Sequence, residues 1–140
     1  MSLKIIHTAD WHLGQTFFGY DRDDENEAFL SWLTDLLVQR QTDVLLIAGD
    51  VFDVANPSAA AQRRFFWFLR EANRRNPHLQ IVVIAGNHDS AARLEAPIPL
   101  LEELNTSIVG IVPRTDLCKI DFDSLLIPLY NKEGKPLGVC

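Results

Sequence analysis

The apolar residues of this chain fall into three short continuous runs, separated by segments with helical spacing. The runs Leu3–His7, Asp43–Ala48 and Leu79–Ala85 predict strands, the first of them central in its sheet and buried on both faces. Strands that alternate with helices favour a parallel sheet joined by right-handed crossovers. The pattern therefore predicts an α/β fold, a layered sheet with helices on its faces.

Two amphipathic helices are predicted between these strands. Within 21–41 the apolar residues recur at helical spacing, and acidic residues crowd the start of the segment, where the helix dipole favours them. The second helix runs from about 58 to 76. Either Ser58 caps this helix, or Asn56 does so with Pro57 at the first helical position.

After the third strand the pattern is less regular. A helical stretch broken by prolines is expected over about 91–104, followed by a short strand near 107–112. Strands are also predicted at Leu117–Phe122 and Ser124–Tyr130, then a turn at 131–135 and a strand that begins at Leu137. The C-terminal end is therefore expected to be β-rich.

Composition narrows the function classes. The 140 residues, 47% of them hydrophobic, suffice for one domain with a sizeable core. The net charge of −6 excludes a basic coat, so a nucleic acid would have to be held by a local patch, a metal or a partner. Cys118 and Cys140 lie outside any C-x-x-C pattern, so we expect free thiols and a cytoplasmic, reducing location. No apolar run is long enough to predict a membrane span.

Polar motifs follow each of the three predicted strands. Asp10 and His12 follow the first strand, Asp50 and Asp53 the second, and Asn87, His88 and Asp89 the third. Asp50 follows Asp10 by 40 residues and Asn87 follows Asp50 by 37, and each interval is long enough for one strand and one helix. Because parallel sheets place their ligands outside the carboxyl ends of the strands, we expect these side chains at one edge.

The residue types at this edge favour a metal centre. On an extended segment Asp10 and His12 project to the same side, and the two oxygens of Asp50 can bridge two ions. Carboxylate, imidazole and the amide of Asn87 suit manganese, iron, zinc or magnesium. His88 can then face a substrate and protonate a leaving oxygen. Each motif alone is also ordinary turn chemistry, and His7 is expected to be a packed core histidine, so the prediction rests on the three motifs together.

The runs His7–Gly14, Ala48–Asp53 and Ala85–Ser90 resemble the first three motifs of the calcineurin-like metallophosphoesterases, in particular their DNA-repair branch. The resemblance covers roughly residues 4–110. It implies a two-manganese exonuclease and endonuclease that acts on DNA ends and hairpins, with an ATPase partner subunit. The site residues that it implies are the metal ligands Asp10, His12, Asp50 and Asn87, the catalytic histidine His88, and Asp53 and Asp89 as groups that orient them.

One departure from the family pattern concerns histidines. Family members complete the metal site with further histidines beyond the third motif, including a G-H-x-H pair, whereas the histidines of this chain are His7, His12, His78 and His88. His78 is expected in a turn at the opposite end of the sheet. We therefore expect residues 1–140 to be the amino-terminal part of a larger nuclease domain and to be inactive alone.

Three function classes remain open from the sequence. The first choice among them is a metal-dependent DNA nuclease that acts in repair and recombination. The first alternative is a phosphoesterase for small phosphoesters or phosphoproteins, which would share every residue of the edge. The second alternative is a non-catalytic scaffold that keeps the fold to bind a partner.

The position of Trp67 on the second predicted helix indicates a surface for binding another molecule. A helical wheel turns it away from the core stripe of the second helix and toward Arg63, Arg70 and Arg74. Trp and Arg are typical of interface hot spots, so we expect protein association, most simply a two-fold dimer. The alternatives are that Trp67 stacks under an arginine of its own helix, or that the arginines contact DNA.

Overall fold

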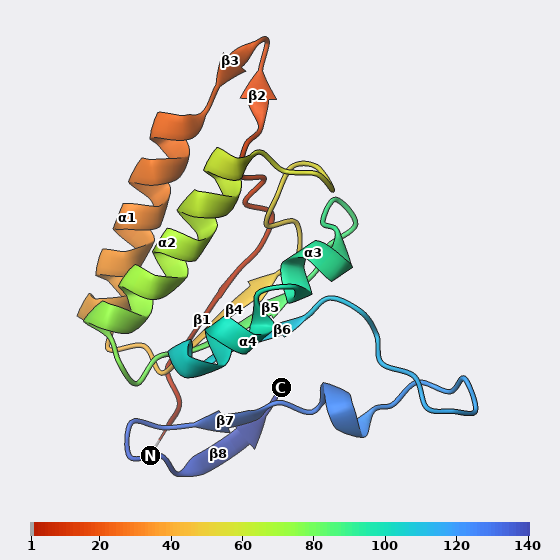
Figure 1. Cartoon of the computed structure of the whole chain (residues 1–140). Helices are drawn as coiled ribbons and strands as arrows, with labels where there is room; N and C mark the ends of the chain where they lie inside the picture. Colours follow the sequence, from red (N-terminus) through yellow and green to blue (C-terminus); the bar gives the residue numbers. More distant parts are fainter. Residues whose placement is uncertain (1) are drawn as a thin grey trace.

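A four-stranded parallel sheet forms the centre of the computed structural model, which describes residues 2–140 (Figure 1). Its strands are β1 (Ile5–Thr8), β4 (Val44–Ala48), β5 (Gln80–Ile84) and β6 (Thr106–Val109), in the order β1-β4-β5-β6. Every neighbouring pair is parallel, as the alternating pattern predicts. The carboxyl ends of β1, β4 and β5 therefore meet at one edge.

Two long helices cover one face of this sheet (Figure 1). They are α1 (Asp23–Gln39) and α2 (Ala59–Arg75), and they pack against each other. The Ala61 N–H donates to Ser58 Oγ at 3.1 Å, so Ser58 caps α2 and the choice between Ser58 and Asn56 is settled.

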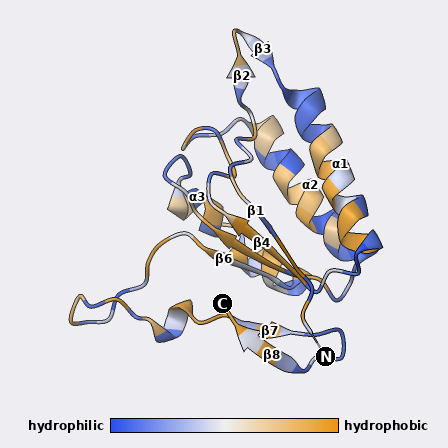
Figure 2. Ribbon diagram, turned by 180° about the vertical axis from the view of Figure 1, so that it is seen from behind, coloured by the Kyte–Doolittle hydropathy of each residue, from blue (hydrophilic) through white to orange (hydrophobic). Residues whose placement is uncertain are grey.

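The main core lies between the sheet and the helices. Residues at odd positions of β4 and β5 face α1 and α2, as the two-residue period of a strand requires. Trp11 lies among the rings of Phe29, Phe65 and Phe68, with edge-to-face contacts to all three. The strands of the sheet are mostly hydrophobic, whereas both helices alternate between hydrophobic and hydrophilic residues (Figure 2).

A β-hairpin packs across the other face of the sheet. It consists of β7 (Pro128–Tyr130) and β8 (Pro136–Val139), with the predicted turn between them. Leu129 contacts Val44 and Val82, which form a second and smaller core. The sheet thus has a helical layer on one side and a hairpin on the other.

Short elements connect these layers. A hairpin of β2 (Thr16–Phe17) and β3 (Tyr20–Asp21) precedes α1 and has no counterpart among the sequence predictions. The broken helical stretch becomes α3 (Ala91–Glu95), α4 (Ile98–Leu101) and the 3₁₀ turn η1 (Glu102–Leu104), and a second 3₁₀ turn, η2 (Asp123–Leu125), precedes β7. Within the described residues, the helices are too short or too polar to cross a membrane.

Some sequence predictions are wrong. In the described chain β1 pairs only with β4 and is an edge strand rather than a central one, so Ile5 is 46% exposed and His7 is exposed instead of packed in the core. Residues 117–122 form turns with one isolated bridge, between Arg114 and Ile120. Their apolar side chains find no sheet to pack on. Of Ser124–Tyr130 only the last three residues are a strand.

Candidate metal centre

The loops after β1 and β4 are joined by backbone hydrogen bonds beyond the ends of the strands. The Asp10 N–H donates to the Gly49 carbonyl at 3.1 Å, and the His12 N–H donates to the Asp50 carbonyl at 3.0 Å. The Leu13 N–H continues the series to Val51 at 2.9 Å. The chain therefore fixes these two loops against each other as firmly as it fixes the strands.

The backbone at this edge is strained. Asp10, His12 and Asp50 have φ angles of 55°, 47° and 48°, a region that residues other than glycine rarely adopt. The expectation that Asp10 and His12 lie on an extended segment is therefore wrong. The left-handed turns instead bury Trp11 in the core and leave the polar residues on either side at the edge. Strain of this kind is concentrated at functional sites.

Glycines let the loops approach closely. Gly49 has a φ of +90°, and a Cβ on it would lie 3.2 Å from the Gly86 Cα. A Cβ on Gly86 would overlap the side chain and the backbone nitrogen of Asp50. The glycines before Asp50 and Asn87 are thus required so that the loop after β5 can touch Asp50.

Five of the seven predicted site residues come together in two overlapping groups. Asp10, His12 and Asp50 form one group, and His12, Asp53 and His88 form the other. Within each group the candidate ligand atoms all lie within 4.8 Å of one another. His12 belongs to both groups, so carboxylates and imidazoles from three strand ends lie next to one another at this edge.

His12 is held between two carboxylates. Its Nδ1 lies 3.2 Å from Asp53 Oδ1, and its Nε2 lies 3.9 Å from Asp50 Oδ2. Although Nδ1 is close to Asp53, the angle is unsuitable for a hydrogen bond, and this buried nitrogen has no hydrogen-bond partner among the described residues. A buried nitrogen without a partner beside several carboxylate oxygens fits a cation ligand.

Two hydrogen bonds orient His88, one from its backbone N–H and one from its ring. Its N–H donates to Asp50 Oδ1 at 2.9 Å, and its ring Nδ1 lies 2.7 Å from the Asp53 carbonyl. Because a carbonyl only accepts, Nδ1 carries the proton and Nε2 is left for chemistry. The hydrogen bond to the Asp53 carbonyl, together with the carboxylates of Asp50, Asp53 and Asp89, raises the pKa of His88 above its usual value.

Asp89 turns away from the cluster and braces the loops. Its Oδ1 accepts from the Phe52 N–H at 2.9 Å, and its Oδ2 accepts from Val51 at 3.1 Å and from Gly86 at 2.9 Å. It thereby ties the loop that follows Asp50 to the loop that contains His88. Its role is to hold these backbone segments in place, and its carboxylate is not part of either group.

Asn87 and His78 complete the predicted set. Asn87 is exposed in the same loop, beside the His88 N–H that binds Asp50. His78 lies at the amino ends of the strands, as expected, and lines a cavity there.

A cavity of about 490 Å³ adjoins Asp10 and His12. Gln15, Arg22 and Asn26 line it from the β2–β3 hairpin and the start of α1. Sequence reasoning missed these residues, because Arg22 and Asn26 were assigned only to the start of a helix and Gln15 was assigned to no element. The available signal was Gly19 within an aromatic run, because glycine is typical of a turn.

Comparison with known proteins gives consistent matches. The profile of the calcineurin-like phosphoesterase family matches residues 3–134. The chain is 48% identical to the SbcD subunit of the nuclease SbcCD from Rhodobacter capsulatus over 133 residues, which are 95% of this chain and 33% of that protein.

Two further relatives carry the same name. The chain is 39% identical to the protein of Escherichia coli K12, over 86% of this chain and 33% of that relative. It is 40% identical to the protein of Bacillus subtilis, over 87% of this chain and 31% of that relative. The chain thus spans about a third of the length of the curated relatives that it matches.

Proposed function

The chain belongs to the calcineurin-like phosphoesterase family, and from that premise we propose that the protein is the nuclease subunit of an SbcCD-like complex. In this proposal it hydrolyses phosphodiester bonds of DNA in a metal-dependent reaction. The relatives that are named as SbcD subunits of this nuclease support the assignment. Its role would lie in DNA repair and recombination.

The observation that carries the proposal is the pair of groups that share His12. Four acidic or imidazole side chains around it come from three separate strand ends, and their ligand atoms lie within 4.8 Å within each group. A parallel sheet positions ligands in this way at its carboxyl edge. Like charges at such distances repel each other, so the arrangement favours a state in which cations are bound.

The ligand set in this proposal is Asp10, His12, Asp50 and Asn87. It would hold two divalent ions, with manganese the first choice and magnesium, iron or zinc as alternatives, because oxygen and imidazole donors suit all of them. When bound, such ions would supply charge neutralisation at a phosphoryl group and an activated water at neutral pH.

His88 acts on the substrate rather than as a ligand. Its Nδ1–H is engaged by the Asp53 carbonyl, so Nε2 is the atom that can hold a proton for a leaving oxygen. The hydrogen bond from Nδ1 to the Asp53 carbonyl raises the pKa of His88, which favours the protonated ring that this step requires. Asp53 positions both His12 and His88, and Asp89 fixes the loops that carry them.

The complete protein extends beyond this chain in our proposal. Residues 1–140 form the amino-terminal part of a single nuclease domain, and further ligands come from the remaining sequence. The threefold greater length of the relatives supports this division. An SbcC-like ATPase is the proposed partner, DNA ends and hairpins are the substrates, and the cytoplasm is the location.

The test compares two phosphodiesters. With manganese, the full-length protein should degrade linear duplex DNA much faster than a generic aryl phosphodiester. The reverse preference would identify an enzyme for small phosphoesters. No hydrolysis of either substrate, in wild type and in Asp50→Asn alike, would identify a non-catalytic scaffold.

A homodimer through α2 is the last part of the proposal. Trp67 is 43% exposed, and with Arg63, Arg64 and Glu27 it lines a cavity of about 200 Å³ between α1 and α2. Trp67→Glu should convert a dimer of the full-length protein into a monomer in a solution mass measurement. Trp32→Glu, at the exposed Trp of α1, is the matched control that should leave the mass unchanged. Equal masses for wild type and Trp67→Glu would contradict this interface.

A further inference from the structure

The β2–β3 hairpin displays three aromatic side chains to solvent. Phe17, Phe18 and Tyr20 are 64%, 88% and 79% exposed, and the rings of Phe17 and Phe18 lie 4.6 Å apart. The hairpin projects beyond the amino ends of α1 and α2, on the side of the molecule where the strands end (Figure 1). A contiguous exposed aromatic patch of this kind marks a binding surface.

The turn of this hairpin uses an unfavourable residue. Phe17 pairs with Tyr20, so Phe18 and Gly19 are the two turn residues, with φ angles of 49° and 85°. Two positive φ angles define a type I′ turn, which favours Asn-Gly. A bulky aromatic residue at the first position strains the backbone and is not required by the fold. Phe18 is therefore better explained by what it contacts outside the chain.

The hairpin is anchored directly to the proposed metal centre. The Gln15 N–H donates to the His12 carbonyl at 3.0 Å, and Arg22 Nη1 donates to Gln15 Oε1 at 2.9 Å. These bonds clamp the two strands at their base. The cavity that adjoins Asp10 and His12 reaches Gln15 and Arg22, so it extends from the metal centre to the base of the hairpin.

The charged side chains at the base of the hairpin limit which ligands can bind to it. Arg22 is paired with Glu25 and Arg64 with Asp23, whereas Asp21 and Asp24 are exposed. These carboxylates disfavour a run of phosphates along the hairpin itself. The end of a duplex differs from its interior because the terminal base pair presents an aromatic face without phosphates. Aromatic side chains stack on such faces regardless of sequence.

We propose that the β2–β3 hairpin stacks Phe18, supported by Phe17, on the terminal base pair of a DNA end whose backbone lies at the metal centre. This inference rests on the proposed nuclease function and adds a determinant of end recognition to it. The interior of a duplex offers no exposed base face, so the contact favours ends.

The experiment uses the full-length protein and a blunt duplex with nuclease-resistant linkages. The duplex carries 2-aminopurine either at the terminal pair or in the centre. Wild type should quench the terminal probe and leave the central probe unchanged. Phe18→Asn should abolish the quenching and weaken end binding by about 5- to 150-fold, the range for loss of one stacked base. The same variant should keep or raise the melting temperature, because Asn suits the turn.

Phe122→Asn is the matched control, since Phe122 is 69% exposed in the C-terminal segment. It should bind DNA ends as wild type does. If Phe18→Asn quenches the terminal probe as wild type does while the nuclease remains active, the stacking proposal is wrong and the proposed function stands. If wild type neither binds nor cleaves DNA, both are wrong. If Phe18→Asn loses only its association with the ATPase subunit, the hairpin is a protein contact and not a DNA contact.

Discussion

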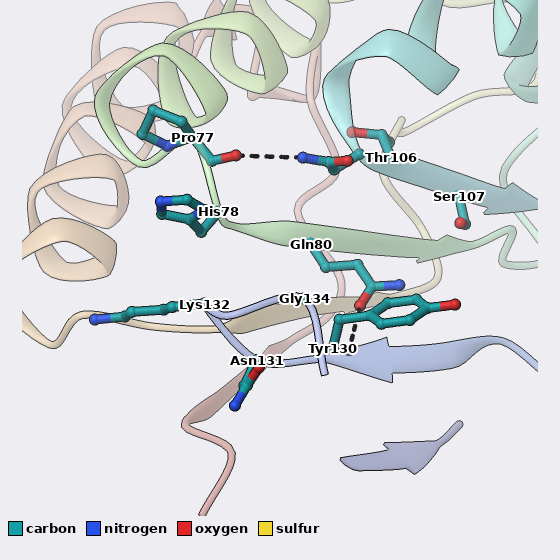
Figure 3. Close-up of a pocket in the computed structure, with 10 residues that line it drawn as sticks. Pro77, His78, Gln80, Thr106, Ser107, Tyr130, Asn131, Lys132 and Gly134 are labelled. Atoms are coloured by element: carbon teal, nitrogen blue, oxygen red, sulfur yellow. Dashed lines mark hydrogen bonds between the residues drawn. The ribbon is translucent and has the colours of Figure 1, made fainter. Parts of the chain in front are cut away.

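The two ends of the central sheet differ in the charge of the polar side chains that gather there. At the amino end a cavity of about 400 Å³ lies between β5, β6 and the β7–β8 hairpin (Figure 3). Gln80 donates to the Pro128 carbonyl at 2.8 Å and accepts from the Tyr130 N–H at 3.2 Å. Asn105 donates to the Pro77 carbonyl at 3.3 Å. These polar groups hold the fold together.

The carboxyl end has the opposite character. Carboxylates crowd around His12, whose Nδ1 is buried without a hydrogen-bond partner in the described chain. Asp10, His12 and Asp50 have positive φ angles there, as Gln41 and Asn105 have at the amino end. Uncompensated charge and strain lower stability unless a ligand relieves them. Crowded charge therefore distinguishes the candidate site from the other end of the sheet, whereas a cavity and positive φ angles occur at both ends.

The largest effect is expected from Asp50→Asn. This variant keeps an oxygen for the His88 N–H but removes the charge that serves both ions. Manganese affinity of the full-length protein should fall at least 100-fold, since even groups behind the ligands contribute 10- to 100-fold. Without metal, its melting temperature should equal or exceed that of wild type, because repulsion is relieved. Calorimetry measures the affinity, and Ser107→Ala at the amino-end cavity is the control that should bind manganese normally.

His88→Leu should separate chemistry from metal binding. The rate of DNA hydrolysis should fall by about 10² to 10⁴, the usual contribution of a general acid, while manganese affinity stays within a few-fold of wild type. Asn87→Ala should behave in the reverse way, with weaker metal binding and a rate that recovers at high manganese concentration. An equal loss of metal in both variants would contradict this division of roles.

Asp89→Ala should lower the stability of the fold. It leaves the N–H groups of Val51, Phe52 and Gly86 without their acceptor, and hydrogen bonds to a charged group contribute about 1.5–3 kcal/mol. The free energy of unfolding in urea should therefore fall by about 2–3 kcal/mol. Asp24→Ala, at an exposed position of α1, should change it by about 0.5 kcal/mol or less. Similar values for the two variants would argue against the brace.

The smallest effect is expected at the amino end. Gln80→Ala removes two partly exposed hydrogen bonds to β7, so the free energy of unfolding should fall by about 1 kcal/mol. Manganese affinity should not change. Thermal unfolding and calorimetry on the same samples check both statements, and a weaker metal affinity would remove the contrast between the two ends.

The spacing of apolar residues along the chain was enough to predict the inner strands and the two long helices. The strands at 44–48 and 80–84 and the two long helices follow from period, whereas the choice of Ser58 over Asn56 as the cap of α2 needed the structure. The edge position of β1 did not, because a short apolar run does not reveal how many neighbours a strand has. The β2–β3 hairpin was missed because Phe18 stands where Asn or Gly is the usual signal.

The candidate site was predicted in its residue types and not in its backbone. The spacing of Asp10, Asp50 and Asn87 follows from one strand and one helix per repeat, so their common edge could be expected. The left-handed angles at Asp10 and His12 depend on burial of Trp11 between α1 and α2, which is a tertiary contact. The brace formed by Asp89 likewise depends on where two loops meet.

The most direct test of the metal centre is an anomalous difference map from crystals of the full-length protein soaked in manganese chloride. We expect two peaks at the carboxyl edge, both at coordination distance from Asp50, with Asp10 and His12 beside one of them and Asn87 beside the other. We expect no peak in the cavity lined by His78 and Gln80. A map with no peak beside Asp50, or with its strongest peak at the amino end, would contradict the proposed metal centre.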